Sequence, residues 1–175
     1  MSNLKDNPKY NNFKVTCIGA ANIDRKANIM HQVRFNSSNP VTSITSCGGV
    51  ARNIAEYVGR LGCNAHIITR IGTDSEGAWV VKKSEPFVHF HSIDVYPTDK
   101  TGSYTAILDP EGEMVIAIAE MGIYDTINEE FIEERWEQIA SSQWVVLDTN
   151  FPCHVLSYII RRCYQEQVPL AVVPG

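Results

Sequence analysis

Residues 47–55 read Cys-Gly-Gly-Val-Ala-Arg-Asn-Ile-Ala and place two glycines directly before a helical pattern. Apolar residues recur at helical spacing from Val50 to Leu61, and Gly62 follows where a left-handed C-terminal cap is usual. The bare backbone of the glycine pair can approach a ligand closely, and the free N–H groups of the helix start can donate to its oxygens. A tight turn needed only for packing would have the same sequence. No Gly-Lys-Ser/Thr follows, which excludes a P-loop.

Outward from this helix, short apolar runs alternate with helical patterns along the chain. We expect strands at 13–19, 65–72, 144–147 and 168–173. Three further helices are expected: one that begins near 74–75, one over 128–141 and one over 155–165. Asp74 or Ser75 can cap the first of these helices. Parallel strands connected by helices form a doubly wound sheet, which binds ligands outside the carboxyl ends of its strands. The sequence therefore predicts an α/β fold with a mostly parallel sheet.

The middle of the chain predicts an antiparallel unit. Residues 103–108 and 113–119 are rich in β-forming residues and are joined by Asp-Pro-Glu-Gly at 109–112, with proline and glycine where a type I turn favours them. This hairpin, the polar stretch 26–46 and a strand near 87–95 would together form a small sheet that stands off the main one. We expect this sheet to act as a lid, with lid segments about 26–46 and 87–119.

Composition and charge bound the class of protein. The 175 residues are 44% hydrophobic, enough for a packed core, and 15 Lys+Arg against 20 Asp+Glu give a net charge of −5. This charge offers no general attraction to nucleic acid or anionic lipid. No apolar run reaches the roughly 18 residues of a membrane span, and the polar N-terminus has no signal-peptide core. We therefore expect a cytoplasmic protein with a flexible tail over 1–12, a folded region over 13–175, and neither nucleic-acid nor membrane partners.

Cysteine and histidine spacing predicts no metal site. The five cysteines are scattered without a Cys-x-x-Cys pair, which favours free thiols over a disulfide framework or a zinc ribbon. His89 and His91 would point to the same side of a strand, a spacing that can hold a metal, but no third ligand is near them in the sequence. We interpret them as ordinary strand histidines.

A wider pattern around the glycine pair resembles a known family. Residues 48–55 have the pattern Gly-Gly-x-Ala-x-Asn-x-Ala, with Gly62 and Gly72 at fixed distances beyond. This pattern resembles the first signature of the PfkB-type ribokinase family of carbohydrate and nucleoside kinases. Residues 19–24, Gly-Ala-Ala-Asn-Ile-Asp, also resemble that family's first strand and turn, where an Asn and an Asp bind sugar hydroxyls. The resemblance covers 13–175 and implies that these residues are the N-terminal, substrate-binding part of a ribokinase-like domain, a doubly wound, mostly parallel sheet with a small β lid.

Within that family, the chain is most similar to the members that act on pseudouridine, through residues 22–24, 48–55, 101–104 and 112–121. The resemblance implies transfer of the γ-phosphoryl group of ATP to the 5′-hydroxyl of this nucleoside. The side chains suit such a ligand, because Asp24 can accept two ribose hydroxyl protons while Asn22 and Asn53 both donate and accept. The expected substrate-binding residues are Asn22, Asp24, Gly48, Gly49, Asn53, Thr101, Ser103 and Asn150.

Some of these residues have an equally good structural explanation. The family's lid suggests that Thr101 and Ser103 touch the ribose or the base, but alternate Thr and Ser are also ordinary strand residues. Asp148 and Asn150 follow a buried strand, where switch-point ligands are held, and Asn150 resembles the family's later polar contact. Asn150 can equally serve as the N-cap of the helix beyond Pro152.

The catalytic half of the family pattern is not expected in this chain. The family's base is the Asp of a Gly-Ala-Gly-Asp motif, and an upstream Asn-x-x-Glu motif helps to organise magnesium; we expect this chain to lack both. Val173 stands where related kinases often carry an acidic residue. We therefore assign no catalytic, cofactor-binding or metal-binding residue. ATP and Mg²⁺ are expected as cofactors of the complete family enzyme only, and this chain, truncated before the nucleotide-binding half, is expected to be inactive alone.

Two other functions stay open. The chain can be a truncated, non-catalytic binding module, or part of a PfkB-type kinase for ribose or another sugar or nucleoside. The lack of a basic cluster around Gly48 in the sequence argues mildly against a phosphorylated sugar. The expected partner is therefore a small-molecule nucleoside or sugar, and a homodimer through the lid is implied by the resemblance alone.

Overall fold

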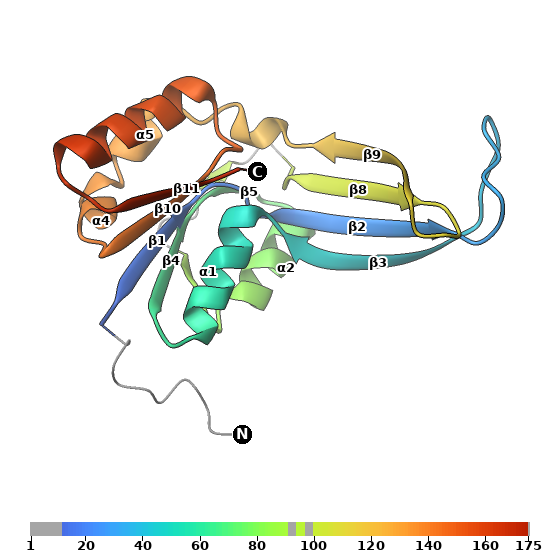
Figure 1. Cartoon of the computed structure of the whole chain (residues 1–175), viewed down its shortest axis with the longest axis horizontal. Coiled ribbons are helices and arrows are strands. Elements are labelled where there is room, and N and C mark those ends of the chain that lie inside the picture. The colour runs from blue at the N-terminus through green and yellow to red at the C-terminus, as the bar shows by residue number, and fades with distance from the viewer. Residues whose placement is uncertain (1–11, 91–93, 97–99, 175) are drawn as a thin grey trace.

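The computed structural model describes residues 12–90, 94–96 and 100–174 (Figure 1). Its main sheet, sheet A, has the strand order β11-β10-β1-β4-β6, and all neighbouring strands are parallel. The predicted α/β fold with a mostly parallel sheet is confirmed. The expected tail, apart from Asn12, lies outside the described residues, as does His91. The strand bounds are Lys14–Ile18 (β1), Asn64–Ile68 (β4), His89–Phe90 (β6), Trp144–Asp148 (β10) and Leu170–Val173 (β11).

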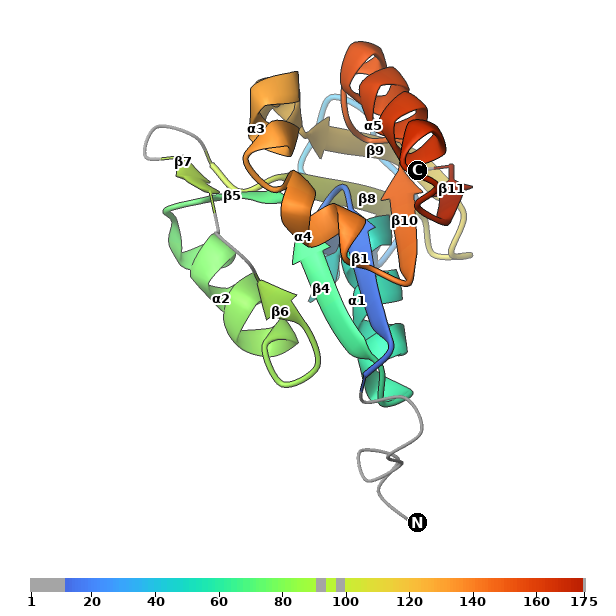
Figure 2. The same cartoon turned by 90° about the vertical axis from the view of Figure 1, so that its left-hand side faces the viewer.

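Helices cover both faces of sheet A, as Figure 2 shows from the side. Successive strand residues point to opposite faces, so Val15 and Cys17 join one core while Ile18 joins the other. The first core lies under α1 and α2, and the second lies under α3, α4 and α5. The helix bounds are Val50–Arg60 (α1), Ser75–Ser84 (α2), Glu129–Glu133 (α3), Trp136–Ala140 (α4) and Cys153–Gln165 (α5). The predicted glycine cap after α1 is confirmed, because Gly62 has a φ of 90°.

A second sheet, sheet B, extends away from the carboxyl end of β1 (Figure 1). Its strand order is β3-β2-β8-β9, with β2 parallel to β8 and both outer pairs antiparallel. The predicted hairpin is confirmed as the β8–β9 pair, and most of the stretch 26–46 lies in β2, β3 and their connection. The strand bounds are Asn22–Ile29 (β2), Val41–Gly48 (β3), Ser103–Leu108 (β8) and Met114–Glu120 (β9).

Two predicted strands are distributed differently from the prediction. The run 65–72 is divided into β4 in sheet A and β5 (Arg70–Gly72), which pairs in parallel with β7 (Asp94–Tyr96). The strand expected near 87–95 therefore does not join sheet B, because its first part is β6 beside β4 and its second part is β7. A local apolar pattern predicts a strand but does not determine which neighbour it pairs with.

The helix expected over 128–141 is two short helices. Asn128 caps α3 by accepting a hydrogen bond from the Phe131 N–H at 3.0 Å. At the break, the Arg135 guanidinium donates to the Phe131 carbonyl at 2.8 Å, while the Arg135 N–H donates to Ile132 O. The side chain thus takes the carbonyl that an unbroken helix would pair with the backbone of residue 135. Among all these described helices, none has both the length and the hydropathy needed to cross a bilayer.

Asp74 connects the start of α2 to the entry of β8. Its Oδ1 accepts hydrogen bonds from the Gly77 N–H and the Thr101 hydroxyl, both at 2.7 Å, and its Oδ2 accepts from the Thr101 N–H at 2.8 Å. Asp74, rather than Ser75, is therefore the cap of the helix. Partial burial raises the pKa of this carboxyl, but these hydrogen bonds outweigh it and leave the pKa below the ordinary 3.8.

We predict that Asp74→Ala lowers the free energy of unfolding by about 1–2 kcal/mol near neutral pH, as for other lost N-caps. Because the pKa is lower in the folded chain, the charge-dependent part is present above the unfolded value near 3.8 and is lost as the pH falls through the folded value. Urea unfolding of both chains at neutral and strongly acidic pH measures this. Ser75→Ala is the control, with little expected loss. An equal Asp74→Ala effect at both pH values would contradict the role of the charge.

Candidate functional site

The turn between β1 and β2 presents the first two predicted site residues. Asn22 and Asp24 are alternate residues of β2 and therefore share one face of sheet B. The Asn22 amide Nδ2 donates to Asp24 Oδ1 at 2.7 Å, which orients the carboxylate. Asn22 is buried and Asp24 is half-buried, so part of the Asp24 side chain stays accessible to solvent.

Both glycines of the pair make room for this turn. Gly48 lies opposite Asn22 in the β2–β3 register, and a Cβ at position 48 would lie 2.2 Å from Asp24 Oδ1. Gly49 has a φ of 91°, and a Cβ there would lie 2.2 Å from the Ala20 carbonyl oxygen. A larger residue at either position would displace the turn or the Asp24 carboxylate. Both glycines therefore have a packing role at this turn.

Arg52, which was not predicted as a site residue, makes hydrogen bonds that stabilise the start of α1. Its side chain is buried, and its Nε donates to the Gly48 carbonyl oxygen at 3.1 Å. The same guanidinium donates to Asn53 Oδ1 and to Glu56, and reaches the Ser84 hydroxyl at 3.2 Å. Arg52 and Glu56 have the i,i+4 spacing of a helical ion pair, which is the signal in the sequence that could have revealed this network.

A fully buried carboxylate, Asp148 at the end of β10, joins this turn to α1. Its Oδ2 accepts hydrogen bonds from the Ala20 N–H at 2.8 Å and the Ala51 N–H at 2.9 Å. The Ala51 N–H belongs to the first turn of α1, where the helix dipole also favours a negative charge. A Cβ at Gly19 would lie 2.2 Å from the Asp148 carboxyl carbon, so this glycine is needed for the contact.

Asn150 is attached to the site through Asp148. Its backbone N–H and its Nδ2 donate to Asp148 Oδ1 at 2.9 Å and 3.1 Å. The alternative role of Asn150 as a helix cap is wrong, because the N-cap position of α5 is Pro152 and no side chain caps this helix. The loop after β10 is thus held beside the turn that carries Asn22.

Thr101 and Ser103, the two predicted site residues at the start of the β8–β9 hairpin, do not share the sheet face of Asp24. The Thr101 side chain is buried, and its hydroxyl donates to Asp74 and accepts from the Gly72 N–H at 3.2 Å. In the β2–β8 register Ser103 lies opposite Ile23, whereas Tyr104 lies opposite Asp24. Because paired residues share a sheet face, the face that carries Asp24 carries Tyr104 and not Ser103. Tyr104 is therefore a site candidate that the residue types alone did not single out.

Tyr124, which follows β9, holds the turn between β1 and β2 by hydrogen bonds to Ala21. Its buried hydroxyl donates to the Ala21 carbonyl oxygen at 2.7 Å and accepts from the Ala21 N–H at 3.0 Å. Its ring stacks on Phe151 with centroids 6.1 Å apart. The residue directly before Asn22 is therefore held at both of its backbone polar groups.

Burial determines the ionisation behaviour around the turn. Desolvation raises the pKa of the Asp24 carboxyl, while the Asn22 hydrogen bond and the charges of Arg52 and Lys26 act against it. Beneath the turn, burial and the nearby Asp148 raise the pKa of the Cys17 thiol to about 12, so Cys17 stays a neutral core residue. The groups that can contact a ligand here are thus hydrogen-bonding carboxylate and amide groups rather than a nucleophile.

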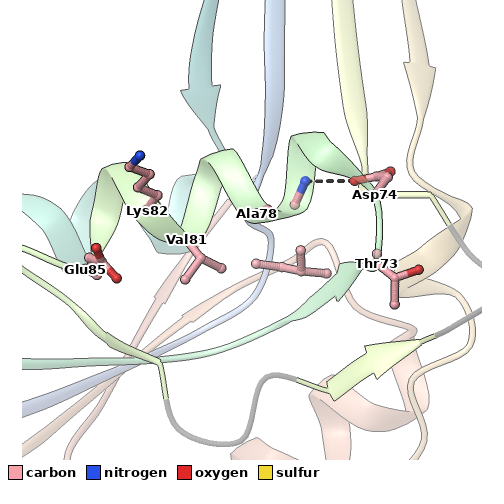
Figure 3. A pocket seen from close by; sticks show the side chains of 9 residues that line it. Thr73, Asp74, Ala78, Val81, Lys82 and Glu85 are labelled. Carbon is pink, nitrogen blue, oxygen red and sulfur yellow. Dashed lines mark hydrogen bonds between the residues drawn. The ribbon is translucent and has the colours of Figure 1, made fainter.

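The hollow of about 560 Å³ shown in Figure 3 is a different place. It runs along α2 from Thr73 and Asp74 past Ala78 and Val81 to Glu85. None of the eight predicted substrate-binding residues lines it. The predicted residues therefore lie outside the lining of this hollow.

The described residues contain no group of three or more His, Cys, Asp or Glu side chains that could hold a metal. The His89 ring lies beside the His66 ring across the β4–β6 pair, tilted by 33° with centroids 5.1 Å apart. The letters Asn-x-x-Glu do occur in the chain, at Asn53-Ile54-Ala55-Glu56, contrary to the expectation that this motif is absent. Glu56 is paired with Arg52 and Arg60, which lower the pKa of its carboxyl against the effect of burial. We assign no magnesium to it.

Comparison with known proteins gives consistent results. The model of the pfkB family carbohydrate kinase matches residues 12–173. Pseudouridine kinase of Escherichia coli strain K12 is 31% identical over 161 residues, which are 91% of this chain and 51% of that protein. A carbohydrate kinase from Agrobacterium tumefaciens has a TM-score of 0.82 at 30% identity, over 91% of this chain and 53% of its own.

Ribokinase from Arabidopsis thaliana, solved with ribose and ATP, has a TM-score of 0.82 at 19% identity over 93% of this chain and 53% of its own, which shows the fold alone. The architecture described above is thus the ribokinase-like fold. The chain spans about half the length of the relatives that it matches.

We predict that Asp148→Asn lowers the free energy of unfolding by about 3 kcal/mol, because the new amide donor would face N–H donors in a buried position. Urea denaturation measures the change. Asp125→Asn, at an exposed position, is the matched control and should change stability by less than about 0.5 kcal/mol. A loss below about 1 kcal/mol for Asp148→Asn would contradict the role given to this carboxylate.

Proposed function

Because the chain belongs to the pfkB family of carbohydrate kinases, we propose that the cluster around Asp24 binds the ribose hydroxyls of a nucleoside, and that the complete enzyme phosphorylates the 5′-hydroxyl of pseudouridine. The observation that carries this proposal is the Asp24 carboxylate. It is half-buried, oriented by the Asn22 amide and given room by the missing side chain at Gly48.

The geometry suits a polyol better than a charged ligand. A carboxylate accepts hydrogen bonds from two neighbouring hydroxyls, and its ionised form is the stronger acceptor. The Asn53 oxygen is engaged by Arg52, so the Asn53 amide group is the part that donates to the ligand. Tyr104 shares the face of Asp24 and offers a ring and a hydroxyl to the nucleoside. Thr101, Ser103 and Asn150 then act by positioning the surrounding segments.

Phosphoryl transfer requires groups that this sequence does not supply. No Gly-Ala-Gly-Asp motif occurs in the 175 residues, so neither the base nor the anion-binding backbone of the family is assigned to any of them. ATP and Mg²⁺ therefore belong to the complete enzyme in this proposal. The chain by itself binds the nucleoside without turning it over.

Thermal unfolding with added pseudouridine, uridine or ribose at about millimolar concentration tests the proposal, because a ligand that binds the folded state raises the midpoint. We expect pseudouridine to give the largest rise and Asp24→Asn to reduce its affinity at least about tenfold, since hydrogen bonds to charged groups are worth about 1.5–3 kcal/mol. Asp125→Asn is the control and should bind as the unmodified chain does. No consumption of ATP is expected in the same samples.

Each other outcome favours an alternative. A rise with ribose or uridine equal to that with pseudouridine would move the substrate to another sugar or nucleoside. A cooperative transition without any ligand shift would leave a binding module that keeps the fold without nucleoside affinity.

The proposal includes a homodimer through sheet B. Large apolar side chains are exposed on this sheet, and the register puts Ile116 on the face opposite to Asp24 and Ile44 on the same face as Asp24. An open sheet with exposed apolar residues favours association that covers them.

We predict that Ile116→Lys converts a dimer into a monomer in sedimentation equilibrium, because a charge would be placed in the buried contact. Ile44→Lys, on the other face, is the matched control and should leave the dimer intact. A monomeric unmodified chain at about 50 μM, or a dimer that survives Ile116→Lys, would rule out this contact.

A further inference from the structure

A second hollow, of about 330 Å³, lies between α1, α2 and β3. Thr45 and Cys47 face it from β3, and they lie on the sheet face opposite to Asp24, which pairs with Ser46. Trp79 forms a half-buried aromatic wall from α2. None of the eight predicted substrate-binding residues lines this hollow, although Ser46, the register partner of Asp24, and Arg52 adjoin both places. Its lining residues are Thr45, Ser46, Cys47, Arg52, Glu56, Arg60, Trp79 and Lys83.

The charges in this hollow are unbalanced. Arg52, Arg60 and Lys83 line it against a single carboxylate, Glu56. Glu56 is shared between the two arginines, with Oε2 toward Arg52 and Oε1 at 2.7 Å from Arg60. Counting formal charges, three positive and one negative leave the hollow at +2, in a chain whose net charge is −5. The structure thus assembles near Gly48 the basic cluster that the linear sequence does not show.

The third cation is placed to contact a ligand. Lys83 is exposed on α2, and its ammonium lies 6.0 Å from the centroid of the Trp79 ring. Its charge also reaches the Cys47 thiol, where Lys83 and Arg52 lower a pKa that burial raises. Lys83 therefore faces the same space as the β3 residues rather than open solvent alone.

We propose that this hollow binds a phosphate group, either free or as a phosphomonoester. A phosphate dianion matches the formal charge of +2, and its oxygens can accept from the Lys83 ammonium, the Arg60 guanidinium and the Thr45 hydroxyl, while the buried Arg52 adds its charge. The volume is near the lower end of the range for small-molecule sites. The inference does not depend on whether the Asp24 cluster binds a nucleoside.

The Cys47 thiol makes the site measurable, because it lines the hollow and an occupant would shield it. The experiment follows alkylation of the whole chain by N-ethylmaleimide with peptide mass spectrometry, and the exposed Cys153 serves as internal reference. Inorganic phosphate and glycerol 3-phosphate are the two probes, with sodium chloride at equal ionic strength as the blank. At a probe concentration ten times the dissociation constant, alkylation of Cys47 should slow about elevenfold relative to Cys153, as 1 + [L]/Kd requires for a shielding ligand.

Two neighbouring lysines provide the matched pair. Lys83→Gln should abolish the protection, whereas Lys82→Gln, which removes the same charge from the adjacent residue facing the other hollow, should preserve it. Lys83→Arg should retain it, because the cation is kept. Protection by both probes identifies the phosphate group itself as the ligand, and protection by glycerol 3-phosphate alone identifies a phosphomonoester. No protection by either probe, or protection that survives Lys83→Gln, would overturn the proposal.

Discussion

A buried carboxyl group at the end of β10 connects the parts of the chain that carry the candidate site. Asp148 accepts hydrogen bonds from the turn after β1 through Ala20, from the first turn of α1 through Ala51, and from its own loop through Asn150. An uncompensated charge in an apolar interior is very costly, so these three segments cannot separate without a large loss of stability. These hydrogen bonds therefore hold the turn in its geometry in the folded chain without a bound ligand.

The absence of side chains matters as much as their presence around this charge. Gly19 gives Asp148 its place, Gly48 gives Asp24 its place, and Gly49 lets α1 begin directly against the Ala20 backbone. Each of these positions would bring a Cβ to 2.2 Å from another atom. The glycines at 19, 48 and 49 are thus required by close packing between three segments, and the position of the Asp24 carboxylate follows from that packing.

Arg52 links the two faces of the molecule where small molecules are proposed to bind. On one side it donates to the Gly48 carbonyl and to Asn53, and on the other it lines the hollow with Lys83. Because one buried guanidinium contacts both places, a change in the hydrogen bonds at either one affects the same side chain. The chain spans about half the length of the relatives that it matches. We assign the groups that would complete a kinase to the part of those relatives that this chain does not match.

The sequence by itself determined the elements whose signals are local. Helical spacing and a terminal glycine predicted α1, a proline-glycine turn predicted the β8–β9 hairpin, and strand-helix alternation predicted sheet A. It also proposed Asn22, Asp24 and the glycine pair as site residues, since these lie in two short contiguous motifs. Only the tertiary structure decided that β6 and β7 pair with β4 and β5, that Tyr104 rather than Ser103 shares the face of Asp24, and that basic residues of two helices meet at one hollow. Such facts depend on strand register and on contacts between distant segments, which no local periodicity encodes.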